Sequence, residues 1–196
     1  EMQEIAKAIQ RFRQDTGYYP KTGPFDLKSA GGEVVTGKSD AWFYSPANLD
    51  QLTSITSPLP DTHQLFKWEP ETGRGWRGPY LKGHDDGIVS ISDNLNSVVD
   101  LTADPPIMLT TGNVGGSPTS TSGAVIDNVP GLADPFEHRP VEGRLQWRAD
   151  AGAPARDFWG RPYLVFGWEK SPFIVSMGPD GDYDRAADNI RLEIGN

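Results

Sequence analysis

The residues best suited to chemistry lie near the end of the chain, in a short acidic segment. Asp180, Asp182 and Asp184 stand at alternate positions, and Asp188 follows four residues later. Carboxylates this close repel one another unless a positive charge lies among them. Calcium binds carboxylate and carbonyl oxygens, and the alternation resembles the first ligand positions of a calcium loop. We interpret the segment as a structural Ca²⁺ site that helps the last strand to dock; a solvated turn is the alternative.

Two further groups of residues are candidates for a site. His84-Asp85-Asp86 is a possible metal or acid–base site, although a histidine beside carboxylates is more often a surface residue. Trp76, Trp159 and Trp168 are either a carbohydrate platform or core residues, and core packing is the preferred interpretation. No nucleophile elbow, zinc-protease motif or phosphate-binding glycine loop occurs. We therefore predict a protein that is not an enzyme.

Composition narrows the class of protein further. The chain has 196 residues, a formal net charge of −9 and no cysteine. The negative charge argues against nucleic-acid binding, and the lack of cysteine excludes disulfides and thiolate metal sites. No apolar run is long enough to span a membrane. The 22 glycines and 17 prolines indicate many loops, and the length favours one domain over residues 1–196.

The elements that must position these residues are one clear helix and several strands. Residues 1–16 place Met2, Ile5, Ile9 and Phe12 at helical spacing, which predicts an amphipathic helix that ends at Gly17. Since nothing before Glu1 resembles a cap, we expect this helix to continue upstream. A second short helix is predicted over 47–55.

Strands are expected mainly in the C-terminal part. Residues 157–167 and 172–176 read as a hairpin joined by Trp168 to Ser171, and 191–194 as a last strand. Residues 33–36 and 87–92 are also strand-like, and 110–123 form a low-complexity loop. A helix followed by a small antiparallel sheet predicts an α+β fold.

Four motifs, in order, resemble the major pseudopilin of the bacterial type II secretion system, a relative of type IV pilins. Gln14-Asp15-Thr16-Gly17-Tyr18-Tyr19-Pro20 is similar to the helix exit of that family. Trp76-Arg77-Gly78-Pro79-Tyr80-Leu81 and Asp157-Phe158-Trp159-Gly160-Arg161-Pro162-Tyr163 are similar to its two aromatic turns. Ser176-Met177-Gly178-Pro179-Asp180-Gly181, followed by Asp188-Asn189-Ile190, resembles its closing segment. Each motif alone is weak, but the order of four is fairly specific.

The resemblance implies a pilin-like fold in which an N-terminal helix packs on a small antiparallel sheet beside a C-terminal calcium loop. Residues 1–16 are then the C-terminal half of the pilin helix, whose apolar first half anchors the full-length protein in the inner membrane. The globular part is expected in the periplasm, where the partners are other pseudopilin subunits and secretion-system components. The implied function is that of a structural subunit of a filament that supports protein export. Without its membrane segment, the chain is expected to be a monomer.

The sequence departs from the family pattern in three places. Residues 82–156 form a large insertion before the C-terminal hairpin and acidic loop of 157–196, and the segment 22–70 is also long. Asn189 replaces the second aspartate of the family ending. This position therefore offers a cation either an amide oxygen or no ligand. A minor pilin or a pseudopilin of a divergent system therefore stays open, as does a non-catalytic, calcium-stabilised extracellular module that binds carbohydrate or protein.

Overall fold

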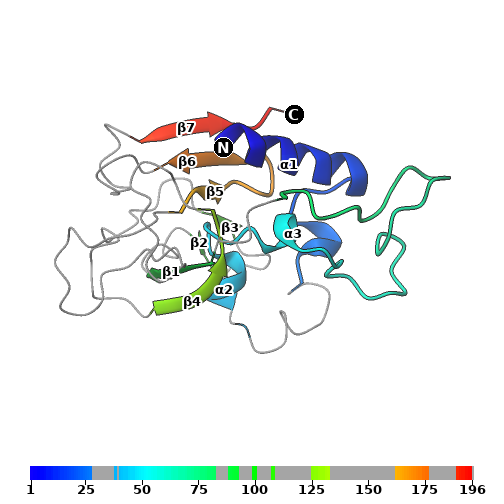
Figure 1. Ribbon diagram of the computed structural model, residues 1–196, viewed down its shortest axis with the longest axis horizontal. Helices are drawn as coiled ribbons and strands as arrows, with labels where there is room; N and C mark the ends of the chain where they lie inside the picture. Colours follow the sequence, from blue (N-terminus) through cyan, green and yellow to red (C-terminus); the bar gives the residue numbers. More distant parts are fainter. Residues whose placement is uncertain are drawn as a thin grey trace.

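Helix α1 (Met2–Thr16) opens the chain and forms one wall of the hydrophobic core (Figure 1). The computed structural model describes residues 1–27, 38, 40–82, 88–92, 99–100, 107–108, 125–132, 162–176 and 189–195. The helix predicted over 1–16 is confirmed, because Ile5, Ile9 and Phe12 are completely buried. It ends at Gly17, whose φ of 85° is left-handed and whose N–H donates to the Arg13 carbonyl.

The segment after α1 forms short helical turns. These are the 3₁₀ turn Gly23–Phe25, α2 (Asp40–Tyr44) and α3 (Asp50–Thr53). The sequence predicts no helix at α2, and the helix predicted over 47–55 is shorter than expected. Asn48 Oδ1 accepts the Asp50 backbone N–H at 2.9 Å, and the Ser54 hydroxyl donates to the Thr56 carbonyl at 2.9 Å. These side chains bond backbone groups at either end of α3 and so limit the helix to one turn.

A three-stranded antiparallel sheet in the order β5-β6-β7 confirms the predicted hairpin and last strand. β5 (Leu164–Phe166) pairs with β6 (Phe173–Ser176), and β6 pairs with β7 (Ile190–Glu193). Every residue of β5 and β6 is buried, whereas most residues of β7 are exposed. Figure 1 shows the sheet next to α1, and both ends of the chain lie in this part of the molecule.

Two smaller antiparallel pairs complete the described strands. β1 (Ile88–Ser92), which confirms the strand predicted over 87–92, pairs with β4 (Val125–Pro130). β2 (Val99–Asp100) pairs with β3 (Ile107–Met108). The sequence predicts neither β4 nor this second pair, which all lie within the polar stretch 82–156.

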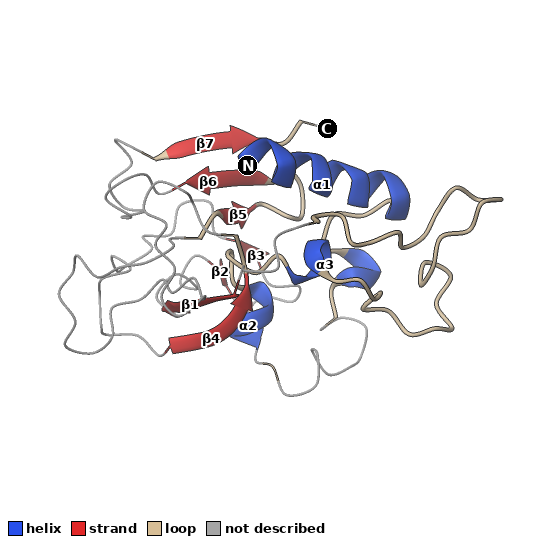
Figure 2. Cartoon of the chain, viewed as in Figure 1, coloured by secondary structure: helices blue, strands red, loops and turns tan. Residues whose placement is uncertain are grey.

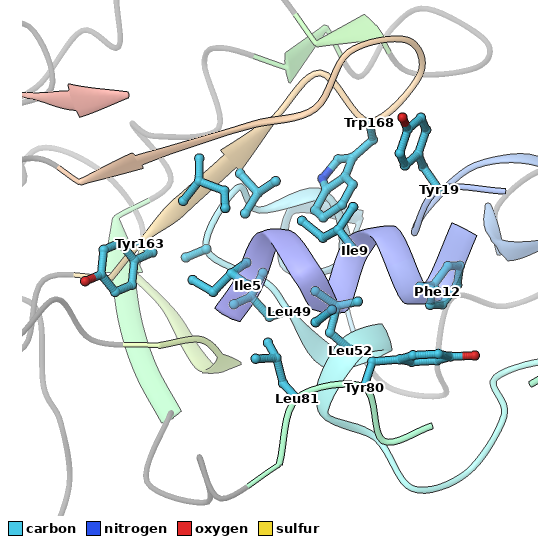
Figure 3. Close-up of a cluster of buried hydrophobic side chains, with 14 of the residues drawn as sticks. Ile5, Ile9, Phe12, Tyr19, Leu49, Leu52, Tyr80, Leu81, Tyr163 and Trp168 are labelled. Atoms are coloured by element: carbon cyan, nitrogen blue, oxygen red, sulfur yellow. The ribbon is translucent and has the colours of Figure 1, made fainter. Parts of the chain in front are cut away.

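The core joins α1, the turns of 18–81 and the sheet in one cluster. Figure 3 shows Ile5, Ile9 and Phe12 of α1 among Leu49, Leu52, Tyr80, Leu81 and Trp168. The ring of Phe12 packs edge-on against Phe25 (centroids 4.9 Å apart) and Trp76 (5.7 Å). The burial of Trp76 and Trp168 confirms core packing for these two residues.

The segment 125–132 contributes to this core although it belongs to the predicted insertion. Val129 and Leu132 are buried. The backbone N–H of Leu49 donates to Pro130, and that of Tyr163 donates to Leu132, so the segment joins the turn before α3 to the start of the sheet. Part of the stretch 82–156 is therefore structurally integral to the domain.

The described residues have the mix of helix and small antiparallel sheet that defines an α+β fold. Several predicted features lie outside the described residues. These are the strand over 33–36, the loop over 110–123, Trp159, and the histidine motif at 84–86.

Candidate functional site

The structure describes one of the five predicted metal ligands. Asp180, Asp182, Asp184 and Asp188 lie outside the described residues, whereas Asn189 stands directly before β7 and its Oδ1 atom is buried. Among the residues that the structure describes, no group of three or more His, Cys, Asp or Glu side chains could hold a metal ion. The predicted calcium site therefore remains a prediction.

The sheet nevertheless determines where the acidic segment begins and ends. Ser176, the last residue of β6, pairs with Ile190, the first residue of β7. The segment 177–189 thus connects neighbouring antiparallel strands, and its two ends lie side by side. A cation bound by its carboxylates and by Asn189 would hold this connection closed, which fits the donor chemistry of calcium.

A polar groove of about 670 Å³ runs between α1 and the segment 77–82, and we call it the α1 groove. Its charged lining residues are Glu4, Lys7, Arg11, Asp15, Arg77 and Lys82. Amphipathic spacing explains the arrangement, since the apolar face of α1 enters the core and its polar face remains exposed along the helix. Figure 2 shows the loop after α3 extending beside the C-terminal end of α1.

Asp15, Arg77 and Tyr80 line the α1 groove where the segment 75–80 meets the end of α1. The Asp15 carbonyl accepts the Gly75 N–H at 2.8 Å, and the Tyr80 hydroxyl oxygen accepts the Arg77 backbone N–H at 3.0 Å. Burial raises the pKa of the Asp15 carboxyl, although Arg77 opposes the shift. Burial also raises the pKa of Tyr80 to about 12. The Tyr80 hydroxyl therefore stays protonated at neutral pH.

A second groove of about 680 Å³ is lined by residues of α1, by Arg74 and by Gly195, and we call it the Arg13 groove. The Arg13 guanidinium donates to the Tyr19 hydroxyl at 2.6 Å and lies 4.6 Å from the centre of that ring. The Arg74 guanidinium donates to the Gln14 carbonyl at 3.1 Å. Hydrogen bonds thus hold both guanidinium groups of the Arg13 groove in place.

Lys21 is a buried lysine that sequence reasoning missed. Its amine donates to the Ser45 carbonyl at 3.0 Å and lies 5.8 Å from the Phe43 ring and 5.7 Å from the Trp168 ring. Burial lowers the pKa of the Lys21 amine to about 7, and Asp50 opposes this shift. The sequence around Lys21 does not predict its burial. Lys21 follows Pro20 in a turn, where a lysine is ordinarily exposed.

Of the three histidines, the structure describes His63. His63 lies in a turn, where its Nδ1 atom accepts the Leu65 backbone N–H at 3.1 Å. His84 and His138 lie outside the described residues.

No protein-family model, curated protein or solved structure matches this chain. In the part of the chain that the structure describes, no helix has the length and apolar character needed to cross a membrane.

Proposed function

We propose that this chain is the globular head of a pilin-like subunit that polymerises into a periplasmic filament of a type II secretion system and so supports protein export. The observation that carries the proposal is the two-faced helix α1. Its apolar face lies in the same core as the three-stranded sheet, and its opposite face stays exposed over the full length of the helix. A filament subunit needs one helical face to hold its own head and another to meet neighbours.

The four sequence motifs support the same proposal from different parts of the molecule. The first is the helix exit at Gly17, and the second is the turn at Gly78, where Trp76 and Tyr80 pack beneath the chain with ring centroids 5.5 Å apart. An added Cβ at Gly78 would stand 2.7 Å from the Trp76 ring, so glycine is required at this turn. Of the other two motifs, the described residues are Pro162-Tyr163, which directly precede β5, and Ser176, which ends β6.

The proposal extends to location and to calcium. The full-length protein would be anchored in the inner membrane by an apolar helix preceding residue 1, with the head in the periplasm. Calcium would be held by Asp180, Asp182, Asp184, Asp188 and Asn189, where it would neutralise the carboxylates and tie β7 to the rest of the sheet.

Processing of the complete gene product tests this function. The product is expressed in bacterial cells with and without a prepilin peptidase, and its N-terminus is determined by mass spectrometry. We expect an apolar segment before residue 1, membrane association, and cleavage at the start of that segment only when the peptidase is present. A conventional cleaved signal that leaves a freely secreted protein would contradict the proposal and favour the extracellular binding module.

A further inference from the structure

The outer edge of β7 presents backbone groups to which another strand can bond. In the part of the chain that the structure describes, the sheet has the order β5-β6-β7, so β7 pairs with β6 and is the outermost strand (Figure 1). The strand at the other end of the sheet differs, because the Val165 N–H of β5 donates to the Pro46 carbonyl at 2.8 Å. Among the described residues, the free edge of the sheet is therefore that of β7.

The hydrogen-bond register shows which residues of β7 point outward. The Ile194 N–H donates to the Pro172 carbonyl at 3.0 Å, and this pair continues the register between β6 and β7. Backbone groups of alternate residues point to opposite sides of an antiparallel strand. The even-numbered residues of β7 therefore bond to β6, whereas Arg191 and Glu193 direct their N–H and C=O groups away from it.

The side chains of these two outward residues carry opposite charges. They are 55% and 60% exposed, and the Arg191 Nε atom donates to Glu193 Oε1 at 2.6 Å on one face of the sheet. The Arg191 guanidinium also lies 3.6 Å from the centre of the Phe173 ring. Charged side chains on an edge strand disfavour pairing with an arbitrary strand. The edge of β7 thus selects a strand whose charges are complementary to its own.

A second copy of β7 supplies such a strand. Two outward residues on each β7 allow three antiparallel registers between the copies. One places Arg191 opposite Arg191 and another places Glu193 opposite Glu193, and like charges directly opposite are destabilising. The third register is centred on Leu192 and places Arg191 of each copy opposite Glu193 of the other. It also uses every outward N–H and C=O group of both residues in both copies.

We propose that β7 pairs antiparallel with β7 of a second copy about a two-fold axis at Leu192, which joins the two sheets into one. The two copies contribute the same surface, so the contact closes into a dimer. Ile190, which is 47% exposed, then lies opposite Ile194 of the second copy and beside its Leu192. This dimer goes beyond the proposed function and does not depend on it. The interface is small, so the dimer forms at high protein concentration and dissociates in dilute solution.

Sedimentation equilibrium of the chain up to millimolar concentration tests the dimer, and charge reversal tests its register. Arg191→Glu and Glu193→Arg should each raise the dimer dissociation constant by about tenfold, because each places like charges opposite one another at two symmetric positions. Mixing the two variants in equal amounts should restore the wild-type affinity, since the mixed dimer again pairs each acidic side chain with an arginine.

Two kinds of control separate this pairing from general charge effects. The double variant with Arg191→Glu and Glu193→Arg keeps the net charge and the complementary pairs, so it should dimerise as the wild type does. Lys67→Glu and Glu71→Arg make the same changes of charge on an exposed loop, and alone or mixed they should leave the dissociation constant unchanged.

Four results would overturn the inference. They are a wild-type chain that stays monomeric at millimolar concentration, single variants at β7 that dimerise as the wild type does, a mixture that does not restore the affinity, and an equal loss with the loop variants. None of them affects the processing experiment on the complete gene product, so this inference and the proposed function fail independently.

Discussion

Lys21 places a primary amine inside the hydrophobic core, and its surroundings explain how the fold tolerates it. The amine has one described hydrogen-bond acceptor, the Ser45 carbonyl, and the aromatic rings of Phe43 and Trp168 lie nearby. Asp50, which is partly buried, opposes the lowering of the Lys21 pKa and has its own carboxyl pKa raised by burial. Removing a charge from water without a close counter-ion favours the neutral form.

Stability should therefore rise with pH through the range in which Lys21 loses its proton. The Lys21 pKa is about 7 in the folded chain and 10.5 in an unfolded one, so above pH 7 the unfolded chain binds a proton that the folded chain does not. The free energy of unfolding should increase between about pH 7 and about pH 9, by at most about 3 kcal/mol. Lys21→Met should abolish most of this increase, as measured by urea denaturation.

Lys67→Met is the control for this pH dependence, since the Lys67 side chain is 76% exposed. It should preserve the wild-type slope. A Lys21→Met variant with an unchanged slope would show that another group causes the pH dependence.

The acidic residues near the C-terminus make a second prediction at the same scale. If they bind calcium, adding calcium should raise the melting temperature of the wild-type chain, with about 2.7 kcal/mol of added stability at a calcium concentration a hundredfold above the dissociation constant. Asp180→Ala and Asp188→Ala should each reduce this gain, as measured by thermal denaturation with and without a chelator.

Asp61→Ala is the matched control for the calcium variants, because Asp61 is an exposed carboxylate in a turn. It should retain the full calcium response. A wild-type chain whose melting temperature does not respond to calcium would refute the metal assignment.

At the scale of elements, the turn 73–75 determines where Arg74 meets α1. Gly75 has a φ of 124°, and its N–H donates to the Asp15 carbonyl at 2.8 Å. A Cβ at Gly75 would lie 2.0 Å from the Lys67 carbonyl oxygen, whereas a Cβ at Gly73 would meet nothing within 4 Å. Both glycines have positive φ values, but only Gly73 has room for a side-chain Cβ atom.

Alanine substitutions at these two glycines should distinguish the cost of a positive φ from the cost of a steric clash with the backbone. Gly73→Ala should cost about 1 kcal/mol because of its left-handed φ alone. Gly75→Ala should cost clearly more, since the backbone of 67–68 must move. Equal losses in the free energy of unfolding, measured by urea denaturation, would mean that the turn does not hold the loop against α1.

The helix and the C-terminal sheet were predictable because their patterns are local. The spacing of Ile5, Ile9 and Phe12 defines a buried helical face, and the run Pro172 to Ser176 is a short apolar strand bounded by a turn. β4 was not predictable in this way, because its pairing with β1 joins residues far apart in sequence. Lys21 and the two grooves were missed for the same reason, since their surroundings come from several separate segments.

For the candidate metal site, the sequence points to the residues but not to their arrangement. Composition and spacing single out Asp180 to Asp188, but a ligand set depends on how the loop folds back on itself. What the described structure adds is the pairing of Ser176 with Ile190, which brings the two ends of that loop together.

At the scale of the whole molecule, α1 has a dual role in the proposed function. Its apolar face packs in the core, and we propose that its exposed polar face is the surface that meets neighbouring subunits. A filament assembled along α1 requires the polar face of the helix to be exposed in each subunit. Gln3, Gln10 and Gln14 on this face are exposed.

Cysteine cross-linking in the complete, membrane-anchored gene product tests the filament proposal most directly, because the chain has no cysteine of its own. Gln3→Cys combined with Gln14→Cys places two thiols on the exposed face of α1, and Ile55→Cys combined with Thr62→Cys places two on an exposed loop away from it. After mild oxidation in cells that carry the secretion system, the α1 pair should form a ladder of dimers, trimers and longer species on a non-reducing gel, whereas the loop pair should not. A monomer from the α1 pair, or equal ladders from both pairs, would contradict a filament assembled along α1.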